Sequence, residues 1–162
     1  MADLISKLGM IYELKRKNRW IVRFPAALGL QEFYLKSAAR PSLTQKETEV
    51  EFLNTSVFIL GRFTWNTMVV TLRDPIGPSA TQAVMEWVRL GSESITGRQG
   101  YSSGVKQSIY VEMLDPTGVV VESWLLQDTL LTDVDFGDLD MGDDGVAEIK
   151  LTLRPDRCIN LF

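Results

Sequence analysis

The chain has 162 residues, of which 45% are hydrophobic and 23% charged, and its formal net charge is −4 at pH 7. This length and balance predict one folded domain over residues 1–162 and exclude a disordered or fibrous chain. The acidic net charge gives no general attraction for nucleic acid.

The absence of histidine from the sequence excludes several classes of site. With no histidine and one cysteine, Cys158, the chain can form no histidine-based metal site, no Cys–His nucleophile pair and no intramolecular disulfide. We therefore expect no cofactor and no metal. No run approaches the roughly 20 apolar residues of a membrane span, and the N-terminus lacks the apolar core of a secretory signal, so we expect no membrane segment.

Residues 1–18 are predicted to form an N-terminal arm. Residues 2–12 carry apolar side chains at helical spacing, and the basic run 15–19 is interpreted as a solvated linker in preference to a nucleic-acid patch. Residues 20–24 alternate as a strand that Pro25 ends. After a turn at Gly29, residues 31–38 are predicted to form the returning strand of a first hairpin.

A long central hairpin follows, and we expect the rest of the chain to support it. In residues 46–52, Glu47, Glu49 and Glu51 lie on one face of an extended strand, and the opposite face, with Thr48, Val50 and Phe52, is expected to be buried. Residues 55–61 form the second strand. A simple register would put Val57 and Ile59 on the glutamate side. After Gly61 and Arg62, residues 63–72 predict a further strand.

The clearest helix is predicted after Ser79. Ser79 and Gln82 match a capping box, an apolar stripe includes Trp87, and Gly91 is a suitable terminator. Residues 92–104 are rich in glycine and serine, and we interpret them as an interaction loop or a mobile one.

The C-terminal half continues as strands. Residues 106–114 and 118–126 predict a hairpin with a type I turn over residues 115–118. Residues 128–144 contain seven aspartates but do not match the calcium-loop pattern, so they are interpreted as an acidic strand rim. Residues 146–154 alternate, with Ala147, Ile149, Leu151 and Leu153 expected inward, and residues 155–162 form a C-terminal tail.

The succession of these segments resembles the tail tube proteins of contractile-tailed bacteriophages. The resemblance rests on the early strand 19–24, residues 33–39 with Pro41, the hairpin that ends in residues 60–65, the helix bearing Trp87, and the final region 139–153. Its most specific part is a Gly-Arg-Phe-Thr step into the run Trp-Asn-Thr-Met-Val-Val-Thr, followed by a helix. The entry to the helix and the segment after Pro155 depart from the pattern.

The resemblance implies a mainly β fold: an antiparallel β-sandwich or barrel with one packed α-helix and a long hairpin that contributes to an inter-subunit β-barrel. It also implies a structural virion protein whose homohexameric rings stack into the inner tail tube, a conduit for genome ejection, assembled in the host cytoplasm. The expected partners are other copies of the chain, the tail sheath protein, baseplate and tail-terminator proteins, and DNA in transit without specific binding.

Two groups of residues are singled out on this basis. An anionic tube lining would repel DNA phosphates, which suits Glu47, Glu49 and Glu51 as lumen-lining residues, although an ordinary solvated face would carry the same side chains. The candidates for contact between subunits are Phe52, Asn54, Phe58, Arg62, Asp138 and Asp140.

Two other functions fit the same pattern. One is the tube of a phage-derived contractile injection or secretion system, whose cargo is protein. The other is a monomeric β-barrel ligand-binding protein, which would not form rings. An enzyme is the weakest alternative, because without histidine catalysis would rest on paired carboxylates and no acid–base arrangement is recognisable.

Overall fold

The computed structural model describes residues 13–162, and the predicted helical segment 2–12 lies outside this range. The elements in chain order are β1 (Trp20–Arg23), the 3-10 turns η1 (Ala26–Leu28) and η2 (Glu32–Tyr34), β2 (Leu35–Ala38), β3 (Leu43–Phe52), β4 (Thr55–Trp65), β5 (Met68–Arg73), α2 (Ala80–Gly91), α3 (Ser102–Val105), β6 (Gln107–Leu114), β7 (Val120–Asp135), β8 (Glu148–Arg154) and β9 (Arg157–Asn160). The predicted mainly β, antiparallel class is confirmed.

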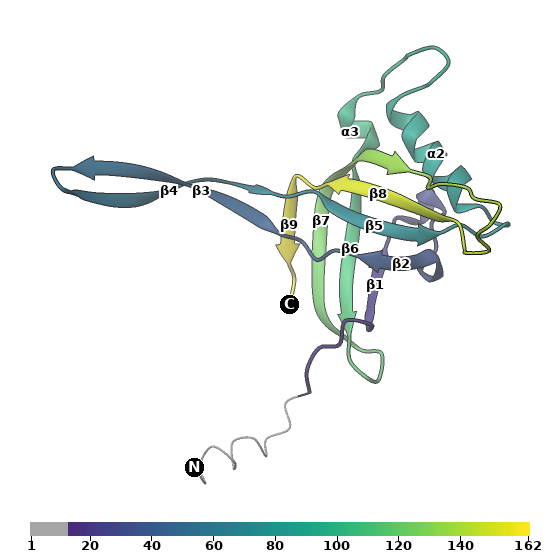
Figure 1. Ribbon diagram of the computed structural model, residues 1–162, viewed down its shortest axis with the longest axis horizontal. Coiled ribbons are helices and arrows are strands. Elements are labelled where there is room, and N and C mark those ends of the chain that lie inside the picture. Colours follow the sequence, from purple (N-terminus) through teal and green to yellow (C-terminus); the bar gives the residue numbers. More distant parts are fainter. Residues whose placement is uncertain (1–12) are drawn as a thin grey trace, which may run out of the picture.

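The strands form a seven-stranded sheet and a separate two-stranded hairpin. The order in the large sheet is β1-β6-β7-β8-β5-β2, with β9 beside β7. Strand β7 bends at Asp128, whose φ is +53°, so its first part pairs with β6 and β9 and its last part pairs with β8. The sheet therefore folds over on itself, and β3 and β4 extend away from it (Figure 1).

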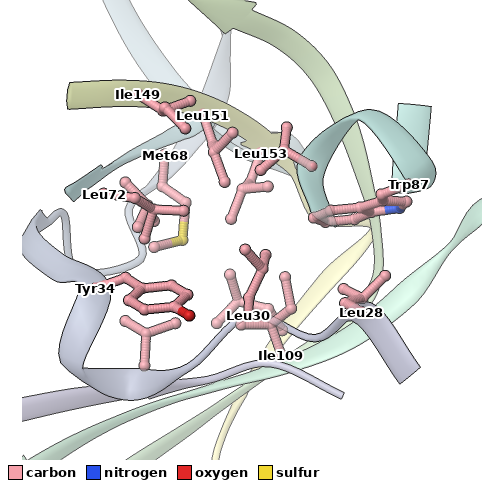
Figure 2. Packing of buried hydrophobic residues seen from close by; sticks show 14 of the residues in the cluster. Leu28, Leu30, Tyr34, Met68, Leu72, Trp87, Ile109, Ile149, Leu151 and Leu153 are labelled. Atoms are coloured by element: carbon pink, nitrogen blue, oxygen red, sulfur yellow. The ribbon is translucent and has the colours of Figure 1, made fainter. Parts of the chain in front are cut away.

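The core fills the space between the two parts of this folded sheet (Figure 2). Alternating side chains of β5 and β8 point inward, and Ile109 of β6 faces them. Trp87 of α2 is fully buried, and its indole Nε1 donates a hydrogen bond to the carbonyl of Val105 at 3.1 Å. The predicted helix and its apolar contact with the sheet are thus confirmed, since the amphipathic period aims one stripe at the core.

The first helical turn of α2 is capped differently from the prediction. Ser79 is the N-cap residue but its side chain makes no capping hydrogen bond. Instead, Oδ1 of Asp74 accepts hydrogen bonds from the backbone amides of Ala80 at 3.1 Å and Thr81 at 3.3 Å. The capping-box prediction is wrong because the turn before the helix brings a carboxylate from outside the helix to its unpaired amides.

The predicted first hairpin is also wrong. Strand β1 pairs with β6 and β2 pairs with β5, so these two segments do not pair with each other. Between them the chain forms η1 and η2, which turn Leu28, Leu30 and Tyr34 into the core. Burial of these three side chains outweighs the local preference for a hairpin, since nonpolar burial is the dominant favourable term.

Four element boundaries differ from the sequence-based expectation. Strand β4 continues through Gly61 to Trp65, and Asn66 and Thr67 separate it from β5. Residues 128–135 of the predicted acidic rim belong to strand β7, but the rest of that rim lies in a loop over residues 136–147, in which Ala147 is exposed. The predicted tail contains β9, which pairs with β7. The turn at residues 115–118 is confirmed, with the amide of Gly118 bonded to the carbonyl of Asp115 at 3.2 Å.

Candidate self-association surface

The β3–β4 hairpin projects from the body of the molecule, and beyond its root no other element of residues 13–162 packs against it (Figure 1). All ten residues of β3 are exposed, and in β4 only Gly61 and Trp65 are partly covered. An isolated two-stranded hairpin is at best marginally stable in water, and its outer edges present unpaired amides and carbonyls. The hairpin therefore has the properties of a surface that another chain covers.

The pairing register determines which side chains share a face. The chain turns at Leu53 and Asn54, so that Phe52 faces Thr55, Glu49 faces Phe58 and Glu47 faces Leu60. Directly paired residues of an antiparallel ladder lie on the same side. Phe58 and Leu60 therefore share the glutamate face, and the expectation that Val57 and Ile59 would do so is wrong, because the two-residue turn sets the register one step away from the assumed one.

Large apolar side chains are exposed on both faces of the hairpin. On the glutamate face, Phe58 is 60% exposed and Leu60 is 75% exposed; on the other face, Val57 is 59% and Ile59 is 55% exposed. Phe52 is 68% exposed, so within one chain the face with Thr48, Val50 and Phe52 is not buried as expected. Contiguous apolar surface of this kind marks an interaction site in a folded protein.

A bulge lies part-way along the hairpin. The register shifts between Gln45 and Glu47, opposite Gly61. A Cβ atom at Gly61 would lie 3.0 Å from the carbonyl oxygen of Lys46, so a side chain there would push the two strands apart. Glycine is favoured at this point because the backbones approach closely where the extra residue is accommodated, and the bulge increases the local twist.

The root of the hairpin is held by hydrogen bonds between its two strands. The amide of Asn66 donates to the carbonyl of Ser42 at 2.9 Å, and its side-chain Nδ2 donates to the Ser42 hydroxyl at 3.2 Å. The hydroxyl of Thr44 donates to Oδ1 of Asn66 at 3.0 Å. These contacts fix where the hairpin leaves the body.

A buried carboxylate joins this root to the sheet. Glu122 of β7 is 4% exposed and accepts hydrogen bonds from the side chains of Lys15 and Arg40, and from Nε1 of Trp124 at 2.7 Å. Arg40 lies three residues before β3 begins, and Trp124 packs edge to face against Trp65, at the end of β4, with ring centroids 6.2 Å apart. Glu122 thus ties the residues before the hairpin, and through Trp124 those at its end, to one point of the sheet.

The charge of Glu122 is stabilised by these partners. Burial by itself would raise the pKa of Glu122, but the hydrogen bonds from Lys15, Trp124 and Arg40, together with the positive charge of Arg40, lower this pKa from 4.5 to about 2. The carboxylate is therefore ionised at neutral pH. Sequence reasoning missed this residue; a glutamate in the apolar strand 120–126 was the only available signal, since its partners lie 82 and 107 residues away.

The residues predicted for function fall at two places. Glu47, Glu49 and Glu51 line one face of β3, and Phe52, Asn54, Phe58 and Arg62 belong to the same exposed hairpin. Asp138 and Asp140 lie in the β7–β8 loop at the opposite end of the molecule (Figure 1). The structure thus brings the hairpin candidates together and separates the two aspartates from them. Their roles in lining a lumen or contacting a subunit remain predictions.

Within residues 13–162, no group of three or more histidine, cysteine, aspartate or glutamate side chains is placed to hold a metal ion. No helix in the same range is long and apolar enough to cross a membrane.

Solved structures with the same arrangement of elements come from contractile machines. The chain matches a protein in the sheath/tube terminator of PVC, an extracellular contractile injection system, with a TM-score of 0.74 and 15% identity. The match covers 94% of this chain and 99% of that one. It also matches a protein of the anti-feeding prophage cap, which terminates the tube of that particle, with a TM-score of 0.72 and 18% identity. This match covers 93% of this chain and 92% of that one. This chain has the tail-tube fold.

A phage protein with this fold is also among the matches. The SPP1 tail tube aligns with a TM-score of 0.50 and 11% identity, over 88% of this chain and 74% of that one. The resemblance found in the sequence is therefore confirmed for the fold. No family model matches the sequence, and no curated protein matches it.

Proposed function

We propose that this protein is a non-enzymatic structural subunit that assembles with copies of itself into hexameric rings, and that these rings stack into the inner tube of a contractile machine. The observation that carries the proposal is the exposed hairpin, whose apolar side chains and free strand edges have no cover within residues 13–162. The tail-tube fold supports it, since the neighbours are tube-terminator and tail-tube proteins.

Ring formation follows from the geometry of an open sheet. The part of the body sheet formed by β8, β5 and β2 has two edge strands. One is β2, and the other is the last part of β7, which pairs with β8. A free edge on each side lets neighbouring copies pair strands in a heterologous contact, and such contacts close into a ring when the rotation per copy divides a full turn. Sheath, baseplate and terminator proteins would then contact the assembled tube.

The glutamates of β3 are proposed to line the lumen. Glu47, Glu49 and Glu51 carry three negative charges on one face of the hairpin. In a closed ring, a face of this charge would keep a polyanion such as DNA from adhering to the wall. In this arrangement Phe58 and Leu60 lie in the channel wall beside the glutamates, and the opposite face, with Val57 and Ile59, meets the neighbouring copies.

Two cargoes are compatible with such a tube. A genome conduit in a virion tail is the first candidate. The tube of a phage-derived injection system that delivers protein is the second, and it is favoured by TM-scores of 0.72 and 0.74 to injection-system proteins, compared with 0.50 to the phage tail tube. Particles isolated from the source cells decide between them: a DNA-filled head on the tube supports the first, and a headless tube supports the second.

The assembly itself is tested by electron microscopy. Purified protein, separated by size-exclusion chromatography and concentrated, is expected to form rings or tubes with an open centre in negative stain. The double variant Val57→Ser/Ile59→Ser should stay monomeric, while Val119→Ser, which alters a 60% exposed valine outside the hairpin, should still assemble. A wild-type protein that stays monomeric at every concentration, also when offered preformed baseplates, would contradict the proposal and favour a monomeric ligand-binding barrel.

A further inference from the structure

The body of the molecule has two chemically different ends. Strand β8 runs from Glu148, beside the β7–β8 loop, to Arg154, beside the hairpin root, and β5 runs the opposite way next to it. A strand of this length spans about 20 Å. The hairpin and the β7–β8 loop therefore lie at opposite ends of the molecule (Figure 1).

The hairpin end contains a groove with an apolar wall and a positive rim. It has a volume of about 480 Å³ and lies between Phe63 and Trp65 of β4 and the segment from Arg154 to Ile159. Arg154 and Arg157 are exposed beside it, and neither forms an ion pair with any residue in the range 13–162. Asp156, the acidic residue of the lining, is paired with Lys106. The groove thus offers apolar contact and two available guanidinium groups.

The loop at the other end has the complementary chemistry. Leu139 is 93% exposed and Met141 is 108% exposed, and they alternate with Asp138 and Asp140. Oδ1 of Asp140 accepts a hydrogen bond from the amide of Gly142 at 2.9 Å, which folds the loop locally while both apolar side chains stay uncovered. Asp143 and Asp144 add two more negative charges. The loop is therefore apolar and acidic where the groove is apolar and basic.

A chain cannot fill its own groove with this loop, because β8 separates the two along its length. A second copy that follows the first along the strand direction brings its loop to the groove. We infer that the β7–β8 loop of one copy docks into the groove beside Arg154 and Arg157 of the next copy, with Leu139 and Met141 against Phe63, Trp65 and Ile159. This rests on the proposed function and names the contact between successive rings.

The hairpin is compatible with this contact. It leaves the body beside the groove, so a second copy seated there lies along the hairpin and covers its exposed apolar side chains. The contact is heterologous and leaves a free loop at one end and a free groove at the other, as an open stack requires. Oppositely charged surfaces also set the direction in which copies add.

Cross-linking tests the contact directly. Cys158 is the single cysteine of the sequence, so the Cys158→Ala background has none. In this background one chain carries Leu139→Cys and a differently tagged chain carries Ile159→Cys. After the chains are mixed, assembled and treated with a short bis-maleimide, a product containing both tags is expected. The matched control replaces Leu139→Cys by Ile95→Cys, since Ile95 is 92% exposed but lies in the loop after α2.

The outcomes separate this inference from the proposed function. Tubes that form but yield no more cross-linked product than the Ile95 control would overturn the docking contact and leave the tube function standing. A wild-type protein that never assembles would overturn both. If the Cys158→Ala background fails to fold, charge reversal gives a second measurement in chains that keep Cys158.

In that measurement Asp140→Arg and Arg157→Glu are each expected to reduce the sedimenting tube fraction by roughly tenfold, because like charges then meet at the contact. The double variant restores opposite charges and should recover much of that fraction, whereas the matched reversal of Glu93→Arg, in the loop after α2, should leave it unchanged. Single reversals that stack as well as wild type, or a double variant no better than either single, would overturn the contact.

Discussion

The body and the hairpin of this protein are built from similar strands in opposite environments. In β5, Met68, Val70 and Leu72 are at most 2% exposed, while the equally apolar Val57 and Ile59 of β4 are 59% and 55% exposed. The strand sequences themselves differ little in hydrophobicity. The comparison shows that an apolar strand indicates burial without indicating whether its own chain or another one provides the cover.

The difference predicts how each region responds to mutation. Substitutions in the body should change the free energy of unfolding of the single chain. Substitutions in the hairpin should change assembly and leave that free energy almost unaltered. The predictions below run from the largest expected loss of single-chain stability to the smallest.

Trp87→Ala should cause the largest loss. Removal of this fully buried side chain leaves a cavity between α2 and the sheet and deprives the Val105 carbonyl of its indole partner. We expect the free energy of unfolding to fall by about 3–5 kcal/mol, measured by urea denaturation of the monomer. Leu90→Ala, on the same helix but 54% exposed, is the control and should cost far less. Equal losses would contradict the assigned core.

Glu122→Gln should cause an intermediate loss, because it removes the charged acceptor shared by Lys15, Arg40 and Trp124. We expect a cost of about 1–3 kcal/mol at pH 7. The hairpin should also become less firmly held, which amide hydrogen exchange at Asn66 can detect, since this amide donates to the carbonyl of Ser42. Exchange that stays unchanged there, with stability reduced, would show that Glu122 supports the sheet without positioning the hairpin.

The same residue gives a pH dependence with a defined sign. The folded pKa of Glu122, about 2, is below its ordinary value of 4.5, so the stabilisation is complete above pH 4.5 and is lost as the pH falls toward 2. Denaturation curves of wild type should therefore lose stability over this range more steeply than those of Glu122→Gln. Parallel curves for the two proteins would show that other carboxylates account for the acid sensitivity.

Asp74→Ala should cost about 0.5–2 kcal/mol, since Asp74 accepts hydrogen bonds from two amides of the first turn of α2. Ser79→Ala is the informative comparison, because the Ser79 side chain makes no capping hydrogen bond. Urea denaturation should rank Asp74→Ala well below Ser79→Ala in stability. The reverse order would restore the capping box that the sequence suggested.

Ile59→Ser should have the smallest effect on the single chain. Ile59 is 55% exposed on the free hairpin, so the free energy of unfolding of the monomer should change by less than about 0.5 kcal/mol. Assembly should nevertheless fail or require much higher concentration, which sedimentation can measure. A variant that is strongly destabilised as a monomer would show that the hairpin packs within its own chain.

Local patterns were sufficient for several parts of this molecule. The helix around Trp87, the turn at residues 115–118, the alternation of Ile149, Leu151 and Leu153, and the existence of the long hairpin were all predictable. Each depends on residues close together in the chain, where periodicity and turn preferences act directly. The order of these segments was enough to recognise the fold.

Tertiary structure decided what those segments contact. Strand β1 pairs with β6, far along the chain, in place of the neighbouring segment, and the two-residue turn at Leu53 and Asn54 sets which side chains join the glutamates. Glu122 acquires its partners only when Lys15 and Arg40 are brought to it. Such pairings depend on which surfaces bury the most nonpolar area together, a property of the whole fold that no local pattern contains.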